Sequence, residues 1–214
     1  MPAPSRRCDT QNMAEMSALD VIFARRAVRD FTDEVLSEST VRRLIDAAIQ
    51  APSAVNVQPW AFVVIQDKAL LKSLSDRAEA IMAAGQDFGQ FAPEQQHRIE
   101  DRSLNIFYNA GTLVLICAKP EGLHPDWDCC FAAQNLMLAA REQGLGTCVI
   151  GFSWPTFNDP DVKKDLGIPK SYRVVTPIIV GRPTDFPQSH GRKRPEILAW
   201  KTGKVLSEPD AFRE

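Results

Sequence analysis

The apolar residues of this sequence fall into short runs of strand length that alternate with helical patterns. None of these runs approaches the roughly 18 apolar residues of a membrane-spanning helix. Residues 112–118 are apolar on both faces, as in a central strand, and further strands are expected at 60–65, 147–150 and 172–181. Because helices separate these strands and no repeat or linker divides the chain, we expect one domain around a mixed α/β sheet.

Helical periodicity and capping residues place the expected helices. Ser37 and Asp67 are suitable N-caps, and Asp159-Pro160 opens a short helix. The segment 126–143 is apolar nearly all round, so we expect a buried helix there. Pro177 interrupts the last strand and suits a bulge or an edge. The expected helices cover residues 17–26, 38–49, 68–81, 126–143 and 160–166.

Two parts of the chain have no regular pattern. Residues 84–109 scatter apolar side chains among polar ones, which predicts broken helices that form a variable cap. Aromatic residues in such a cap could line a substrate site, but core packing is their commoner role. Residues 1–16 lack the apolar core of a secretory signal and are expected to form a flexible tail. The aromatic residues concerned are Phe88, Phe91, Phe107 and Tyr108.

Charge and cysteine content narrow the classes of function. The chain has 25 basic and 27 acidic residues, so it lacks an electrostatic footprint for nucleic acid, and a small-molecule or protein partner is favoured. Its five cysteines and three histidines do not have the spacing of a zinc site. Adjacent Cys129 and Cys130 could be redox-active, although two small apolar residues in a buried helix are the favoured interpretation. A reducing cytoplasm suits this cysteine content best.

An arginine-rich segment runs from Arg25 to Arg29 at the end of the first expected helix. The planar guanidinium of arginine matches phosphate oxygens, so Arg25, Arg26 and Arg29 could together hold a phosphate. The other interpretation is a solvated basic helix end, which complements the helix dipole. Taken alone, the segment favours the second interpretation.

A polar loop lies between two prolines, Pro52 and Pro59, ahead of the first strand. Asn56 offers both a donor and an acceptor, so it can pair with an imide edge such as that of a flavin pyrimidine ring. Alternatively, Ser53 and Asn56 bond their own backbone in a structured turn. The rigid and polar character of the loop favours a binding site.

The sequence Gly144-Leu145-Gly146 precedes a strand, whereas a dinucleotide fingerprint needs its glycines between a strand and a helix. Gly151, at the end of this strand, could expose its backbone N–H to a planar ligand, or it could be an ordinary turn glycine. No serine lies in a nucleophile elbow and no cysteine forms a recognisable catalytic pair with a nearby histidine, so nucleophilic catalysis is poorly supported. Asp126 and Asp128 are read as the start of a helix.

Taken in order, these segments resemble the FMN-dependent nitroreductase family, and the similarity extends over nearly everything after about Ser17. The order and spacing of the motifs make the set specific, although each motif is modest. They are Arg25-Arg26-Ala27-Val28-Arg29-Asp30-Phe31, Ala51-Pro52-Ser53, Asn56-Val57-Gln58-Pro59-Trp60, the helix 128–140 with Gln134-Asn135, Gly144-Leu145-Gly146, the strand 174–181 and Arg192-Lys193-Arg194.

The resemblance implies an α+β fold, a three-layer sandwich with a mixed central sheet, that works as an intertwined homodimer with FMN at the subunit interface. It implies that Arg25, Arg26 and Arg29, with Arg192 or Arg194, hold the phosphate and the N1–O2 edge of the ring. Pro52, Ser53 and Asn56 would come from the partner subunit to the pyrimidine edge. Ile150 and Gly151 would supply backbone contacts near N5 and O4, and residues 195–214 would form an arm that packs on the partner. Ala27 stands where many members have a phosphate-binding serine.

The same resemblance implies an enzyme that reduces nitro compounds or quinones with NAD(P)H, by ping-pong hydride transfer through FMN and without a catalytic side chain. Reactions of other members of the fold remain alternatives: dehalogenation, ene reduction and synthesis of dimethylbenzimidazole. A flavin-binding protein without turnover and a cofactor-free interaction module are alternatives of other classes.

Overall fold

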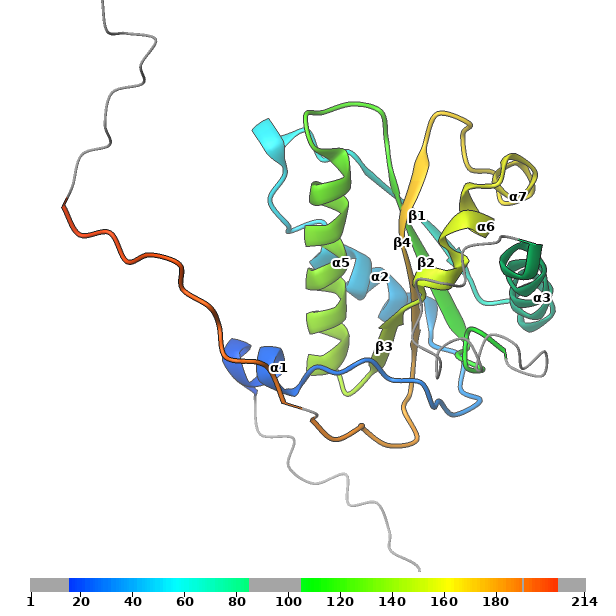
Figure 1. The fold of residues 1–214 in the computed structure, drawn as a ribbon. Coiled ribbons are helices and arrows are strands. Elements are labelled where there is room, and N and C mark those ends of the chain that lie inside the picture. The colour runs from blue at the N-terminus through cyan, green and yellow to red at the C-terminus, as the bar shows by residue number, and fades with distance from the viewer. Residues whose placement is uncertain (1–15, 85–104, 190, 204–214) are drawn as a thin grey trace, which may run out of the picture.

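The fold is built on a four-stranded sheet with the strand order β1-β2-β4-β3. The computed structural model describes residues 16–84, 105–189 and 191–203 (Figure 1). All three strand pairs are antiparallel, and the parallel component of the expected mixed sheet is, within the described residues, a single bridge from Ala27 to Thr147. The strands are β1 (Trp60–Ile65), β2 (Thr112–Ala118), β3 (Gly146–Val149) and β4 (Arg173–Gly181).

Helices cover both faces of the sheet, so the predicted three layers are confirmed (Figure 1). β2 is central and wholly buried, and its side chains alternate between two cores: Leu115 packs in one and Ile116 in the other. On one face lie α2 (Glu38–Ala48) and α5 (Pro125–Glu142), and on the other lie α3 (Lys68–Ala84), α6 (Trp154–Asn158) and α7 (Pro160–Asp165).

The helix starts that capping residues predict are confirmed. The side chain of Ser37 accepts a hydrogen bond from Thr40 N in α2. Asp67 accepts one from Leu70 N at 2.7 Å before α3, and Asp159 caps α7. At the start of α1 (Ala18–Ala24), Ser17 forms a capping box with Asp20 that was not predicted. Helix α6 and the short 3₁₀ segments η1 (Ala54–Asn56) and η3 (Gly151–Ser153) were not predicted, because one turn leaves no periodic pattern.

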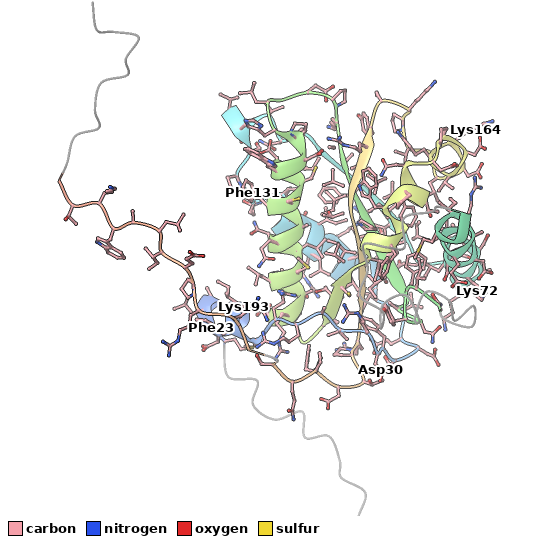
Figure 2. All side chains as sticks on the ribbon, in the orientation of Figure 1. Phe23, Asp30, Lys72, Phe131, Lys164 and Lys193 are labelled. Atoms are coloured by element: carbon pink, nitrogen blue, oxygen red, sulfur yellow. The ribbon has the colours of Figure 1, made fainter. Side chains whose placement is uncertain are left out.

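The expectation that the helix over 126–143 is buried all round is wrong. Its inner face packs on the sheet, but Trp127 is 61% exposed and Phe131 is 49% exposed on its outer face (Figure 2). On α1 the buried residue is Val21, whereas Phe23 is 72% exposed. These apolar side chains face away from the core of the chain that contains them, so periodicity alone could not assign them to solvent or to a neighbour.

Pro177 lies in an internal strand, opposite Leu115 of β2. The expected bulge is confirmed next to it, where the register of β2 and β4 shifts between Ile116 and Cys117. The proline is tolerated because the ladder with β3 begins only at Ile178, and the carbonyl of Pro177 accepts a hydrogen bond from Ile150 N at 2.9 Å.

Most of the expected cap lies outside the described residues, and so do Phe88, Phe91 and residues 1–15. Phe107 is fully buried in the core, which confirms packing as its role, while Tyr108 is half-buried. Residues 191–203 form no helix or strand and run away from the body of the molecule (Figure 1). That they pack on a partner subunit stays a prediction.

Candidate functional site

The arginine-rich segment is fixed alongside β3. Val28 N donates to Thr147 O at 2.9 Å, and the buried Val28 side chain lies against Gly146. A Cβ at Gly146 would come within 2.8 Å of Val28 Cβ, so this close approach requires glycine. Residues 25–29 therefore leave α1 along a defined path at the edge of the sheet.

Four arginines gather at the C-terminal end of α5, and together they are here called the arginine cluster. They are Arg25, Arg26, Arg141 and Arg192. Burial and then the charges of Arg192 and Arg26 lower the pKa of Arg25. Burial and then the charge of Arg26 lower the pKa of Arg141 in the last turn of α5. Within the described residues, none of the ion pairs reaches a member of this cluster. Like charges held together in this way can attract an anion.

Arg141 was not predicted as a site residue. Its guanidinium carbon lies 3.7 Å from the centre of the Phe186 ring, which stacks against it. Its Nε is buried without a hydrogen-bond partner in the described part of the chain, and so is the Nε of Arg26. One guanidinium nitrogen of Arg26 also donates to the carbonyls of Phe23 and Arg25, so this side chain caps the C-terminal end of α1. A basic residue in the last turn of an otherwise apolar helix was the signal available in the sequence.

Arg29 and Cys148 extend the cluster along β3. The Arg29 guanidinium carbon lies 6.0 Å from the centre of the Tyr108 ring. Burial raises the pKa of the Cys148 thiol, and the charges of Arg29 and Arg25 oppose that rise. The positive field therefore reaches from the end of α5 toward the middle of β3.

At the end of β3, Gly151 is open and Ile150 is not. The Ile150 side chain is buried, its N–H donates to Pro177 O, and its carbonyl accepts from Ser153 N and Oγ. Gly151 is exposed, and a Cβ placed on it would meet nothing within 4 Å. Of the two predicted contacts, Gly151 thus has its N–H available to a ligand, whereas the polar backbone groups of Ile150 are already bonded within the chain.

The loop 53–58, between α2 and β1, has an unusual backbone. Val55, Asn56 and Gln58 have φ of 47°, 57° and 54°, in the left-handed region that non-glycine residues avoid. Each such residue costs about 1–3 kcal/mol, so other contacts must hold the loop. The Ser53 hydroxyl accepts from Gln58 N at 3.0 Å, and Asn56 Oδ1 accepts from Gln58 Nε2 at 3.1 Å. Ser53 and Asn56 therefore make the local bonds of a structured turn and keep their own donors for a ligand.

Asp128 anchors this loop to α5. It lies in the first turn of the helix, only 2% exposed, and both carboxylate oxygens accept from Ala54 N, at 3.2 and 3.3 Å. Asp128 and Arg141 are 13 residues apart on one helix, which at 1.5 Å per residue is about 20 Å. A single chain therefore keeps the loop 53–58 and the arginine cluster at opposite ends of α5.

The family model for the nitroreductase family matches residues 22–182, about three quarters of the chain. The chain belongs to the nitroreductase family.

Two relatives and one crystal structure are similar to this nitroreductase-family chain over most of its length. A protein of Archaeoglobus fulgidus, provisionally named NADH dehydrogenase/NAD(P)H nitroreductase, is 30% identical over 84% of this chain and 95% of its own. The 5,6-dimethylbenzimidazole synthase of Rhodospirillum rubrum is 29% identical over 86% of this chain and 89% of its own. A nitroreductase with bound FMN from Desulfitobacterium hafniense has a TM-score of 0.75 and 27% identity, covering 89% of this chain and 100% of its own. The expected fold class is confirmed.

Four more predicted residues of this nitroreductase-family chain are Ala27, Pro52, Arg192 and Arg194. Pro52 and Arg194 are exposed, and Arg192 donates to the carbonyl of Gly191 beside Arg25. Ala27 forms the bridge to Thr147 through its backbone. Its methyl side chain offers no hydrogen bond, so in this segment an anion could be held only by the arginines and by backbone N–H groups.

Burial decides the chemistry of the adjacent cysteines. Cys129 is fully buried and Cys130 is exposed, so the expectation of two buried residues is correct only for the first. Burial, reinforced by Asp126, raises the pKa of Cys129 to about 12, and it also raises the pKa of Cys130. Neither thiol is activated as a nucleophile.

Two further observations concern metal binding and membrane insertion. Over residues 16–84, 105–189 and 191–203, no group of three metal-ligating side chains gathers in one place. In the same residues, none of the helices combines the length and the apolar character needed to cross a membrane.

Proposed function

We propose that this chain is an FMN-dependent oxidoreductase that takes electrons from NAD(P)H and reduces nitro compounds or quinones. The arginine cluster is the observation on which the proposal rests. Its members repel one another, and none of the described carboxylates neutralises them. A phosphate dianion is the ligand that such a cluster fits, because guanidinium groups bind its oxygens with charge-assisted hydrogen bonds.

The residues present fit a flavin nucleotide. Arg25 and Arg192 would hold the phosphate, together with the unpartnered Nε groups of Arg26 and Arg141. Arg29 would favour negative charge at the ring edge, and Gly151 would bring an N–H close to the ring, because it has no Cβ. When bound, FMN supplies the hydride chemistry between NAD(P)H and the oxidant, so the chain needs only to bind and orient the reactants.

The proposal includes a homodimer in which the loop 53–58 of one subunit completes the site of the other. One chain holds this loop about 20 Å from the arginine cluster, so a second copy is the direct way to bring the two halves together. The exposed apolar side chains give such a dimer a surface to bury. They are Leu19, Ile22 and Phe23 of α1, Trp127 and Phe131 of α5, and Ile197, Leu198 and Trp200 of the predicted arm.

We also place this enzyme in the cytoplasm. The four cysteines in the described residues are free, as is usual where thiols are kept reduced.

Synthesis of 5,6-dimethylbenzimidazole is the second candidate. It is favoured by a relative with that activity at 29% identity over 86% of this chain. The two reactions differ in the fate of the flavin, which survives turnover in a reductase and is consumed in the synthase.

The test is made on purified protein loaded with FMN. Bound FMN and oxidation of NADH or NADPH that depends on added nitroaromatic or quinone are expected, with the flavin absorbance recovered afterwards. Protein that neither retains nor takes up FMN would contradict the proposal. Loss of flavin absorbance with formation of dimethylbenzimidazole would favour the second candidate instead.

A further inference from the structure

The loop 53–58 is held in a costly conformation by a contact from outside the loop. Three of its residues have positive φ, and one of them is Val55, whose branched side chain is poorly suited to that region. Its internal bonds join Ser53, Asn56 and Gln58 to one another. Such bonds fix the shape of the loop, but they do not fix its place on the protein.

Asp128 supplies the external contact. Both of its oxygens accept from Ala54 N, next to Ser53, and these are the only bonds of that carboxylate within the described residues. A carboxylate that is 2% exposed carries a large desolvation cost, which an aliphatic side chain of the same shape would avoid. Its position at the start of α5, where the helix dipole favours negative charge, lowers that cost only in part.

We infer that Asp128 is a positioning residue for flavin binding: it places the loop 53–58 so that Ser53 and Asn56 meet the ring in the partner subunit. This inference rests on the proposed function. It goes beyond that function because it assigns a role to a residue that would not touch the flavin, and because it connects the first turn of α5 to the site of the other subunit.

The experiment compares the dissociation constants of FMN and riboflavin in Asp128→Leu. Leucine has the same number of non-hydrogen side-chain atoms as aspartate and no acceptor, and the half-buried Ala54 N–H can bond water instead. Loss of the contact should weaken both flavins by the same factor, about tenfold, because the loop meets the ring that they share. The melting temperature should change little, since a buried charge is removed together with its hydrogen bond.

Asp128→Asn is the conservative variant, because the amide keeps one acceptor for Ala54 N. Its affinity for both flavins should fall about threefold. Asp126→Asn is the matched control: it removes a charge from the same helical turn, but Asp126 pairs with Arg173 and not with the loop. The control should bind both flavins as the unchanged protein does.

The outcomes separate the two claims. If the unchanged protein binds neither flavin, the proposed function fails, and this inference fails with it. If it binds both and folded Asp128→Leu binds them equally well, only this inference is overturned. The same holds if FMN alone is weakened, because the effect would then act through the phosphate. Should Asp128→Leu not fold, Asp128→Asn decides, and unchanged riboflavin binding would overturn the inference.

Discussion

The two ends of α5 have opposite characters. At its C-terminal end the arginine cluster gathers positive charge, with two buried Nε groups that lack acceptors in the described residues. At its N-terminal end a buried carboxylate, Asp128, holds a neutral polar loop in a strained conformation. The C-terminal end is thus characterised by unpaired positive charge, and the N-terminal end by a loop held in a fixed backbone conformation.

This difference indicates two tasks in flavin recognition. A phosphate is recognised by charge, which acts over several ångströms and can be supplied by an exposed side chain such as Arg192. The edge of a planar ring is recognised by hydrogen-bond direction, which requires a fixed backbone. The comparison therefore predicts that the two ends respond differently to substitution.

The largest effect is expected from mixing two damaged proteins. Arg25→Gln with Arg192→Gln disables the arginine cluster, and Ser53→Ala with Asn56→Ala disables the loop. At an FMN concentration where each homodimer is empty, equal mixing should restore about a quarter of the sites, because half of the dimers are mixed and each has one intact site. Bound flavin fluorescence after co-refolding measures this. Recovery of nothing would mean that the two ends do not combine across subunits.

The next largest effect is expected from Arg25→Gln alone. Loss of a charge-assisted contact to the phosphate should weaken the binding of FMN about 100-fold. The binding of riboflavin, which has no phosphate, should stay nearly unchanged. Titration of intrinsic fluorescence with each flavin checks this. Arg42→Gln is the control, since that arginine pairs with Glu38 on the exposed face of α2. Equal weakening of both flavins would contradict the assignment of this end to the phosphate.

A smaller effect is expected at the other end. Asn56→Ala removes a neutral donor and the acceptor of Gln58 Nε2, so FMN and riboflavin should both weaken by about three- to tenfold. The ratio of the two dissociation constants should stay that of the unchanged protein. A change in this ratio, measured in the same titrations, would show that the loop senses the phosphate.

The last effect concerns a thiol next to Asp128 in α5, and it is confined to alkaline pH. Burial raises the pKa of Cys129 from an ordinary value of 9.0 to about 12. As the pH rises, the thiol therefore ionises in the unfolded chain before it ionises in the folded one. The free energy of unfolding should fall by up to about 1.4 kcal/mol per pH unit between the two pKa values. Below the lower pKa it should not depend on this thiol. Urea unfolding of Cys129→Ala should show a shallower fall than the unchanged protein. An identical slope would mean that Cys129 ionises in the folded state.

The sequence by itself determined most of the helices and strands, and its resemblance to the nitroreductase family indicated their layers. Caps at Ser37, Asp67 and Asp159 placed three helices, because a cap acts within one turn of chain. The apolar character of residues 112–118 on both faces identified the central strand. The arginines of the segment 25–29 and the polar loop were also recognised as site candidates, because their chemistry is visible in the residue types.

Only the tertiary structure decided which of these residues act together. Arg141 joins the arginine cluster because α5 ends beside Arg26, and Asp128 reaches Ala54 across 74 positions of sequence. The outer face of α5 also carries large apolar side chains, Trp127 and Phe131, so burial depended on what packs against each face. Short-range sequence patterns fix local backbone geometry, whereas long-range contacts arise from chain topology. For this reason a local pattern predicts neither the charge balance of the site nor the separation of its two halves.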